Sequence, residues 1–134
     1  MKPLTLGIIG AGRIGKLHAK NLMTRVKGTK LKAVSDPFLD EKWAVSNGIP
    51  VTGKDHRIML DDSEIDAVLI CSPSPQHAEQ IIECAQVGKH IFCEKVAQGC
   101  EISRDICECR GLLKDDDLVE HEKCFIQRDF FFFC

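Results

Sequence analysis

Short apolar runs alternate, along residues 4–93, with segments that carry one apolar face. Continuous apolar runs predict buried strands of a parallel sheet, and apolar positions three and four residues apart predict amphipathic helices. Strands are predicted at 4–9, 31–35, 49–51, 66–71 and 90–93, with helices at 13–27, 39–47 and 75–87 between them. Strands separated by helices are typical of right-handed βαβ units. We therefore predict a single α/β domain built on a doubly wound, mainly parallel sheet.

A glycine-rich turn joins the first predicted strand to the first predicted helix. Residues 10–15 read Gly-Ala-Gly-Arg-Ile-Gly, which matches G-x-G-x-x-G in the strand-to-helix context that this motif requires. Gly10 permits a tight turn, Gly12 lets the backbone approach a pyrophosphate, and Gly15 lets the helix lie close to the sheet. The helix N-terminus adds free N–H groups and a positive dipole end. The sequence therefore predicts a Rossmann-like dinucleotide-binding site at this turn.

An acidic residue ends the second predicted strand. Asp36 follows Gly15 by 21 residues, which is the spacing at which such sites place a carboxylate against the adenosine ribose. A carboxylate there accepts hydrogen bonds from both ribose hydroxyls and repels a 2′-phosphate, so we expect NAD as the cofactor in preference to NADP. The alternative is a plain glycine turn, with Asp36 only beginning a turn that contains Pro37.

Composition narrows the class of protein. The chain has 134 residues, 44% of them hydrophobic, and a formal net charge of -2, which suits one folded domain. The near-neutral charge without a basic block argues against a nucleic-acid partner. No apolar run reaches the roughly 18–20 residues of a membrane helix, and the first residues lack a signal-peptide pattern. We therefore expect a cytoplasmic protein without a membrane partner.

The composition changes near residue 97. Three of the eight cysteines precede residue 100, whereas five fall in the last 35 residues. We therefore predict a dinucleotide-binding core at 1–97 and an atypical tail at 98–134, with one further helix at 101–113 and one further strand at 124–127. The run of four phenylalanines at 130–133 predicts an aggregation-prone apolar patch, hence self-association, unless it is buried.

The cysteines are expected to be free thiols, and no metal site is predicted. A metal site in the tail is the alternative, but the spacing is not a recognised zinc pattern. Its candidate ligands are Cys100, Cys107, Cys109, His121 and Cys124.

Four ordered segments resemble the glucose-fructose oxidoreductase, inositol dehydrogenase and rhizopine catabolism (Gfo/Idh/MocA) family. They are residues 7–19, 33–37, 71–79 and 88–95, the last similar to the family's G-K-H-v-f-c-E-K-P signature. The resemblance covers about residues 4–100, and within the family it is closest to the inositol 2-dehydrogenases. It implies NAD(P) binding on a Rossmann domain, and hydride transfer to or from a sugar or cyclitol carbon.

The resemblance also implies roles for single residues. Lys95 would be catalytic, hydrogen-bonding the reacting hydroxyl and favouring its alkoxide-like state, and Glu94 would orient it. The cofactor-binding candidates are Gly10, Gly12, Arg13, Ile14 and Gly15 at the pyrophosphate, Asp36 at the ribose, and Cys71, Ser72, Pro73, His77, Glu94 and Lys95 along the nicotinamide half.

Simpler alternatives remain open for several of these residues. Residues 71–73 would then be only a strand-ending turn, His77 a surface residue, and Glu94 and Lys95 a solvated ion pair. His18 and His90 are expected to be structural, His18 packing on a helix and His90 entering a strand.

The chain departs from the family pattern in two ways. The proline that follows Glu-Lys is missing, because Lys95 runs directly into Val96. No counterpart exists for the family's second domain, which carries most substrate contacts and a catalytic aspartate and histidine. We therefore expect an NAD-binding domain with little turnover by itself. The alternatives are a non-catalytic dinucleotide-binding module and a truncated remnant, whose unusual tail would reflect an altered coding sequence.

Overall fold

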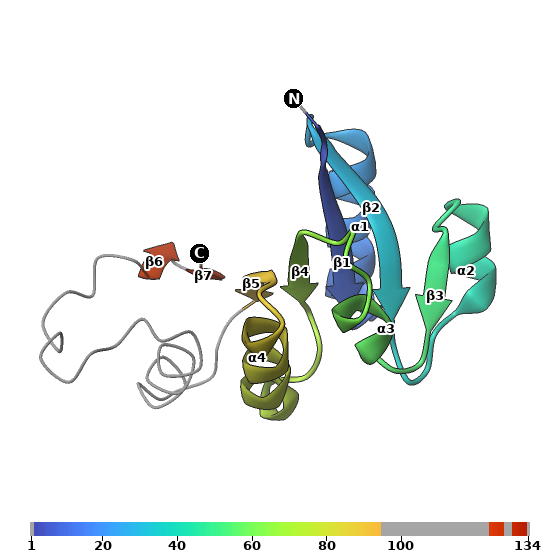
Figure 1. Cartoon of the computed structure of the whole chain (residues 1–134). Helices are drawn as coiled ribbons and strands as arrows, with labels where there is room; N and C mark the ends of the chain where they lie inside the picture. The colour runs from blue at the N-terminus through green and yellow to red at the C-terminus, as the bar shows by residue number, and fades with distance from the viewer. Residues whose placement is uncertain (1, 95–123, 128–129, 134) are drawn as a thin grey trace, which may run out of the picture.

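The computed structural model describes residues 2–94, 124–127 and 130–133 (Figure 1). The described strands form one sheet in the order β3-β2-β1-β4-β5-β7-β6. The strands are β1 (Leu4–Ile9), β2 (Thr29–Ser35), β3 (Val51–Gly53), β4 (Ala67–Ile70), β5 (His90–Glu94), β6 (Cys124–Gln127) and β7 (Phe130–Phe133). The helices are α1 (Arg13–Thr24), α2 (Glu41–Ser46), α3 (Arg57–Leu60), the 3-10 turn η1 (Ser74–Gln76) and α4 (His77–Gln86).

The first five strands are parallel, as the alternating pattern predicts. Strand β1 pairs with β2 on one side and β4 on the other, β2 continues to β3, and β4 continues to β5. Strand β7 then pairs antiparallel with both β5 and β6. The predicted α/β, doubly wound, Rossmann-like fold is therefore confirmed, with an antiparallel pair at one edge.

The structure corrects several predicted boundaries. The first helix ends at Thr24 rather than at residue 27, and Gly28 lies in the turn beyond it with φ 78°. Strand β3 spans Val51–Gly53, so the strand predicted at 49–51 begins two residues too early. The pattern cannot mark α3, because its four residues are too few to show a period.

Two elements in the last part of the chain bear on the predictions for the tail. The strand predicted at 124–127 is β6. The run Phe130–Phe133 forms β7, whose backbone pairs with β5. This strand is not among those predicted from the apolar pattern. The helix predicted at 101–113 lies outside the described residues.

The described helices cover both faces of the sheet, and the side chains of β4 alternate between them. Val68 and Ile70 pack in a core with Ile81 of α4, whereas Leu69 packs on the opposite face in a core with Ala19 of α1. Helix α1 lies behind β1 and β2 in the view of Figure 1. Strand β4 is apolar and buried throughout, and β1 is buried from Thr5 onward, because both faces of these strands are covered.

The direction of the chain across the sheet reverses between β1 and β4. From β1 the chain proceeds to β2 and β3 on one side, and β4 lies on the other side of β1. The connections that leave β1 and β4 therefore diverge from neighbouring strand ends. In open parallel sheets this switch point is where ligands bind.

Candidate functional site

The three glycines of the turn after β1 meet different steric conditions. Gly10 has φ +94°, and a Cβ there would lie 2.6 Å from the backbone of Cys71 and Ser72. A Cβ on Gly15 would lie 1.9 Å from the carbonyl oxygen of Gly10. Gly12 is exposed, and a Cβ there would meet nothing within 4 Å. Gly10 and Gly15 therefore allow the turn and the helix to pack, whereas Gly12 leaves room for a ligand.

Helix α1 starts at this turn without a side-chain cap. Gly12 is its N-cap residue, and Arg13 and Ile14 are its first two residues. The first backbone N–H groups of a helix have no partner within the helix, and they carry the positive end of its dipole. With 12 residues, α1 is long enough for this dipole to act on an anion. The glycine turn and the N-terminus of α1 together therefore suit the binding of a diphosphate.

Asp36 lies at the end of β2, half-buried, beside the same turn. One carboxylate oxygen accepts a hydrogen bond from the Ala11 N–H at 2.7 Å, and the other accepts one from the Phe38 N–H at 2.8 Å. Each oxygen has a further acceptor position. Asp36 thus begins the turn containing Pro37, as the simpler alternative supposes, and is also held against the glycine turn.

A cavity of about 270 Å³ lies between the ends of β1, β2 and β4. Gly10 and Asp36 line one side, and Ser72 and Pro73 line the other. Ser35 also lines it, and its buried hydroxyl has no hydrogen-bond partner among the described residues. An unpaired buried hydroxyl is costly, and a ligand hydroxyl would satisfy it. The cavity therefore fits the polar, sugar-bearing end of a dinucleotide.

The side chains at the loop between β4 and α4 decide one of the simpler alternatives, that His77 is a surface residue. His77 is 3% exposed, so the alternative that it is a surface residue is wrong. One ring nitrogen lies 2.5 Å from the Ser72 carbonyl oxygen, and the other lies 3.4 Å from the Cys93 sulfur. The Ser72 hydroxyl donates to the Gln80 side chain, and Pro73 is exposed before η1. His77 therefore fixes the loop from within.

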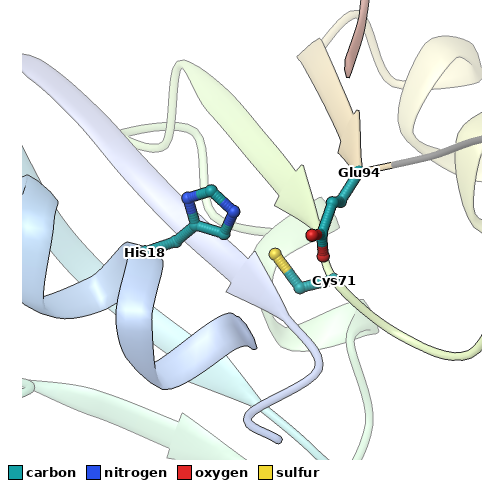
Figure 2. Close-up of side chains that lie close together, drawn as sticks. All are labelled: His18, Cys71 and Glu94. Carbon is teal, nitrogen blue, oxygen red and sulfur yellow. The ribbon is translucent and has the colours of Figure 1, made fainter. Parts of the chain in front are cut away.

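Three side chains with metal-binding atoms converge at the ends of β4 and β5. The ligand atoms of His18, Cys71 and Glu94 all lie within 4.8 Å of one another, and Figure 2 shows them facing a common space. Burial and the nearby Glu94 carboxylate raise the pKa of the Cys71 thiol to about 12. Cys71 is therefore a neutral thiol at physiological pH. Lys95, the predicted catalytic residue, follows Glu94 and lies outside the described residues.

The remaining histidine predictions concern packing. His18 of α1 packs edge-to-face on Phe92, with ring centroids 6.3 Å apart and planes at 74°. His90 is exposed at the first residue of β5. His90 therefore enters a strand, as expected from the sequence, whereas His18 lies on α1 and packs on Phe92 of strand β5 rather than on a helix.

Some residues of these sites carry no sequence prediction as ligand-binding groups. Ser35 directly precedes Asp36 at the end of β2. Its place at a strand end, next to the predicted ribose-binding residue, could have marked it as a candidate for ligand binding. Gln80 and the position of His18 beside Glu94 have no local signal, because both depend on contacts between distant elements.

Comparison with known families decides the assignment. The sequence model of the Gfo/Idh/MocA group, described as an oxidoreductase family with an NAD-binding Rossmann fold, matches residues 4–97. The chain belongs to this family. The resemblance predicted from four short segments is thereby confirmed, and the Gfo/Idh/MocA assignment explains the glycine turn and the strand order together.

Individual relatives of this Gfo/Idh/MocA chain include inositol dehydrogenases. The chain is 44% identical over 90 residues to scyllo-inositol 2-dehydrogenase (NAD(+)) of Bacillus subtilis, covering 66% of this chain and 26% of that protein. It is 39% identical over 94 residues to myo-inositol 2-dehydrogenase of Thermotoga maritima, covering 69% and 28%. The chain thus spans little more than a quarter of the length of these relatives.

A solved structure supports the same assignment. Scyllo-inositol dehydrogenase of Lactobacillus casei, with bound cofactor NAD(H) and scyllo-inositol, aligns with TM-score 0.74 and 34% identity over 84% of this chain and 35% of that one. The shared part is the Rossmann fold, which in the Gfo/Idh/MocA chain carries the glycine turn and Asp36. Among the described residues, no helix has the length and apolar character to cross a bilayer.

Proposed function

We propose that this chain is the NAD-binding part of an inositol or sugar dehydrogenase, in which hydride passes between a secondary alcohol carbon and NAD. The observation that carries the proposal is the glycine turn, where Gly10 and Gly15 have no room for a side chain while Gly12 faces open space. When bound, NAD supplies the hydride acceptor. The relatives named as inositol dehydrogenases supply the substrate class, a cyclitol or a sugar.

We propose that Asp36 selects NAD over NADP. Its two carboxylate oxygens are held by the amides of Ala11 and Phe38, and each keeps an acceptor position for a ribose hydroxyl. A 2′-phosphate at the same place would put negative charge beside the carboxylate, in a half-buried environment where repulsion is weakly screened. The anchored position matters, because Asp36 cannot turn away without giving up both amide hydrogen bonds.

We propose Lys95 as the catalytic residue and Glu94 as the group that orients it. Glu94 ends β5, whose neighbour β4 ends at the loop of Ser72 and Pro73. A lysine just beyond that strand end can hydrogen-bond a substrate hydroxyl, and its charge favours the alkoxide-like oxygen that develops during hydride transfer. The buried ring of His77 holds the intervening loop by its contacts with Ser72 and Cys93.

The test is a titration of the purified chain with NADH and, separately, with NADPH, followed by cofactor fluorescence. We expect saturable NADH binding and NADPH binding weaker by at least about tenfold, equivalent to about 1.4 kcal/mol. Asp36→Asn, which removes the charge, should narrow the difference between the two cofactors. Asp61→Asn is the matched control, since Asp61 is an exposed carboxylate on a different loop. Failure of the folded chain to bind either cofactor would contradict the proposal.

Turnover is tested separately, with NAD and myo-inositol, scyllo-inositol and glucose. Because the chain spans about 28% of its T. maritima relative, we propose that it binds NAD with little turnover unless further structure is supplied. The same coverage favours a second candidate, a dinucleotide-binding module without catalysis. NADH binding together with no polyol oxidation, even after the missing part of a relative is added, would favour that module.

Two further parts of the proposal rest on composition. A reducing, cytoplasmic location suits a chain whose described cysteines, Cys71, Cys84 and Cys93, are all free thiols. Self-association is proposed because of the phenylalanine run at 130–133, and size-exclusion chromatography at two concentrations tests it.

A further inference from the structure

Three unlike side chains approach one point from three elements of the fold. His18 comes from α1, Cys71 follows the last residue of β4, and Glu94 is the last residue of β5. Their nitrogen, sulfur and oxygen ligand atoms lie within 4.8 Å of one another (Figure 2). All three are half-buried, and Cys71 and the neighbouring Phe92 pack against the apolar core on the α1 face of the sheet, so the cluster is not a solvated surface group.

The nitrogen, sulfur and oxygen atoms of the three side chains indicate which metal ion the cluster would bind. A thiolate and an imidazole favour a thiophilic transition metal, whereas Mg²⁺ and Ca²⁺ need oxygen ligands. Zn²⁺ with three protein ligands and one open position is a common arrangement, and its bond lengths place ligand atoms about 3.5 Å apart. Small rotations of the Cys71 and Glu94 side chains would close the present spacing. A coordinating cation deprotonates a thiol, so the neutral state of metal-free Cys71 is no obstacle.

The surroundings support a prepared site. The His18 ring is packed edge-to-face on Phe92, which limits its rotation. His18 also lines a largely apolar groove of about 570 Å³ beside β4 and β5, so its ring is reached from outside the core. The other two described cysteines are unsuitable, because Cys84 and Cys93 are fully buried in the core on the opposite face of the sheet.

We propose that His18, Cys71 and Glu94 bind a thiophilic divalent cation, with Zn²⁺ as the fitting ion, at the carboxyl ends of β4 and β5. The site is separate from the cavity beside Asp36, but it shares Cys71 and Glu94 with the residues expected along the nicotinamide half of the cofactor, and Glu94 is also the group proposed to orient Lys95. Its open fourth position would hold water.

The probe is Co²⁺, added to the reduced, metal-free full chain, with Zn²⁺ then used to displace it. We expect a thiolate-to-cobalt charge-transfer band that Zn²⁺ abolishes. Cys71→Ser should remove this band. His18→Gln and Glu94→Gln should weaken cobalt binding by at least about tenfold, since loss of even an outer-shell partner costs about 10–100-fold.

Matched controls separate this site from other thiols and histidines. His90→Gln and Glu79→Gln change exposed residues of the same types and should leave the titration unchanged. A variant with serine at all five cysteines of residues 98–134 tests the thiols of the tail in the same way. Circular dichroism checks folding, and if Cys71→Ser does not fold, the His18 and Glu94 variants decide the outcome.

Two results would overturn the proposal. One is the absence of a thiolate band in the wild-type chain. The other is a band that persists, with unchanged affinity, in the folded His18→Gln and Glu94→Gln variants, since the ion would then be held by cysteines elsewhere in the chain.

Discussion

The β1-α1-β2 unit and the β4-α4-β5 unit are two parallel βαβ units of one sheet, but they shape their ligand-facing ends by different means. The first uses backbone, because Gly10 and Gly15 exclude side chains and Gly12 leaves an open surface. The second uses side chains, with His77 bridging the Ser72 carbonyl and Cys93 across two strand ends. Asp36, directly after β2, adds a side chain to this end of the first unit. Its carboxylate accepts hydrogen bonds from the amides of Ala11 and Phe38.

This difference determines which substitutions each unit tolerates. The close backbone packing at the glycine turn is disrupted when a side-chain atom is added, whereas the contacts of His77 are lost when a side chain is removed. The two units also lean on opposite helical layers, with α1 on one face of the sheet and α4 on the other. Their ligand-facing ends are in contact, however, because β1 pairs with β4 and a Cβ on Gly10 would meet the backbone of Cys71 and Ser72. Substitutions close to this contact should therefore not be fully additive in their effects on stability.

The largest expected effect on stability is in the β1-α1-β2 unit, at Gly15. Gly15→Ala would place a Cβ 1.9 Å from the Gly10 carbonyl oxygen, where neither backbone segment can yield without moving α1. We expect the free energy of unfolding to fall by about 3 kcal/mol or more, measured by urea denaturation. A variant as stable as the wild type would show that α1 does not approach the turn this closely.

The next effect is on the side-chain unit. His77→Leu removes both ring contacts and leaves the part-buried Ser72 carbonyl without its imidazole partner, which should cost about 1–3 kcal/mol of unfolding free energy. His90→Leu is the matched control, because His90 is exposed and its replacement should change stability by less than about 0.5 kcal/mol. Equal losses of unfolding free energy in His77→Leu and His90→Leu would contradict the claim that the contacts of His77 hold this end of the β4-α4-β5 unit.

A smaller effect concerns the link between α3 and α4. Burial disfavours the charged form of Glu83, but hydrogen bonds from His56 and Arg57 outweigh burial and hold the pKa of this carboxyl below its ordinary value. The Arg57 guanidinium donates to the Glu83 carboxylate at 2.8 Å. We expect Glu83→Gln to lower the free energy of unfolding at pH 7 by about 1 kcal/mol.

The pH dependence gives this prediction its sign. A carboxyl whose pKa is lowered by folding stabilises the protein fully above its unfolded pKa of about 4.3, and the contribution is lost as the pH falls through the folded pKa. The difference between Glu83→Gln and the wild type should therefore shrink on acidification. Glu79→Gln, at an exposed position of α4, should show no such convergence.

The same contrast explains how much the sequence could predict. The parallel strands follow from short-range pattern, and so does the need for glycine at positions 10 and 15, where a Cβ would meet backbone atoms. At Gly12 the described residues leave open space, so its proposed role follows only from its place in the motif. Asp36 follows from its spacing. The burial of His77 and the meeting of His18 with Glu94 could not be predicted, because they depend on how separate strand ends come together. Similarly, nothing local in the run 130–133 indicates that β7 pairs with β5.

The most direct test of the account is an NADH titration of Gly12→Ala beside the wild type, with urea denaturation of both. Gly12 has φ -72° and open space around a Cβ, so the variant should fold. Its stability should lie within about 1 kcal/mol of the wild type, because the lower unfolded-state entropy of alanine is opposed by its poorer fit as an N-cap residue. Its added methyl group would stand where the diphosphate must approach, so NADH affinity should fall at least about tenfold. A stable Gly12→Ala variant that binds NADH as tightly as the wild type would contradict the claim that this turn is the cofactor site.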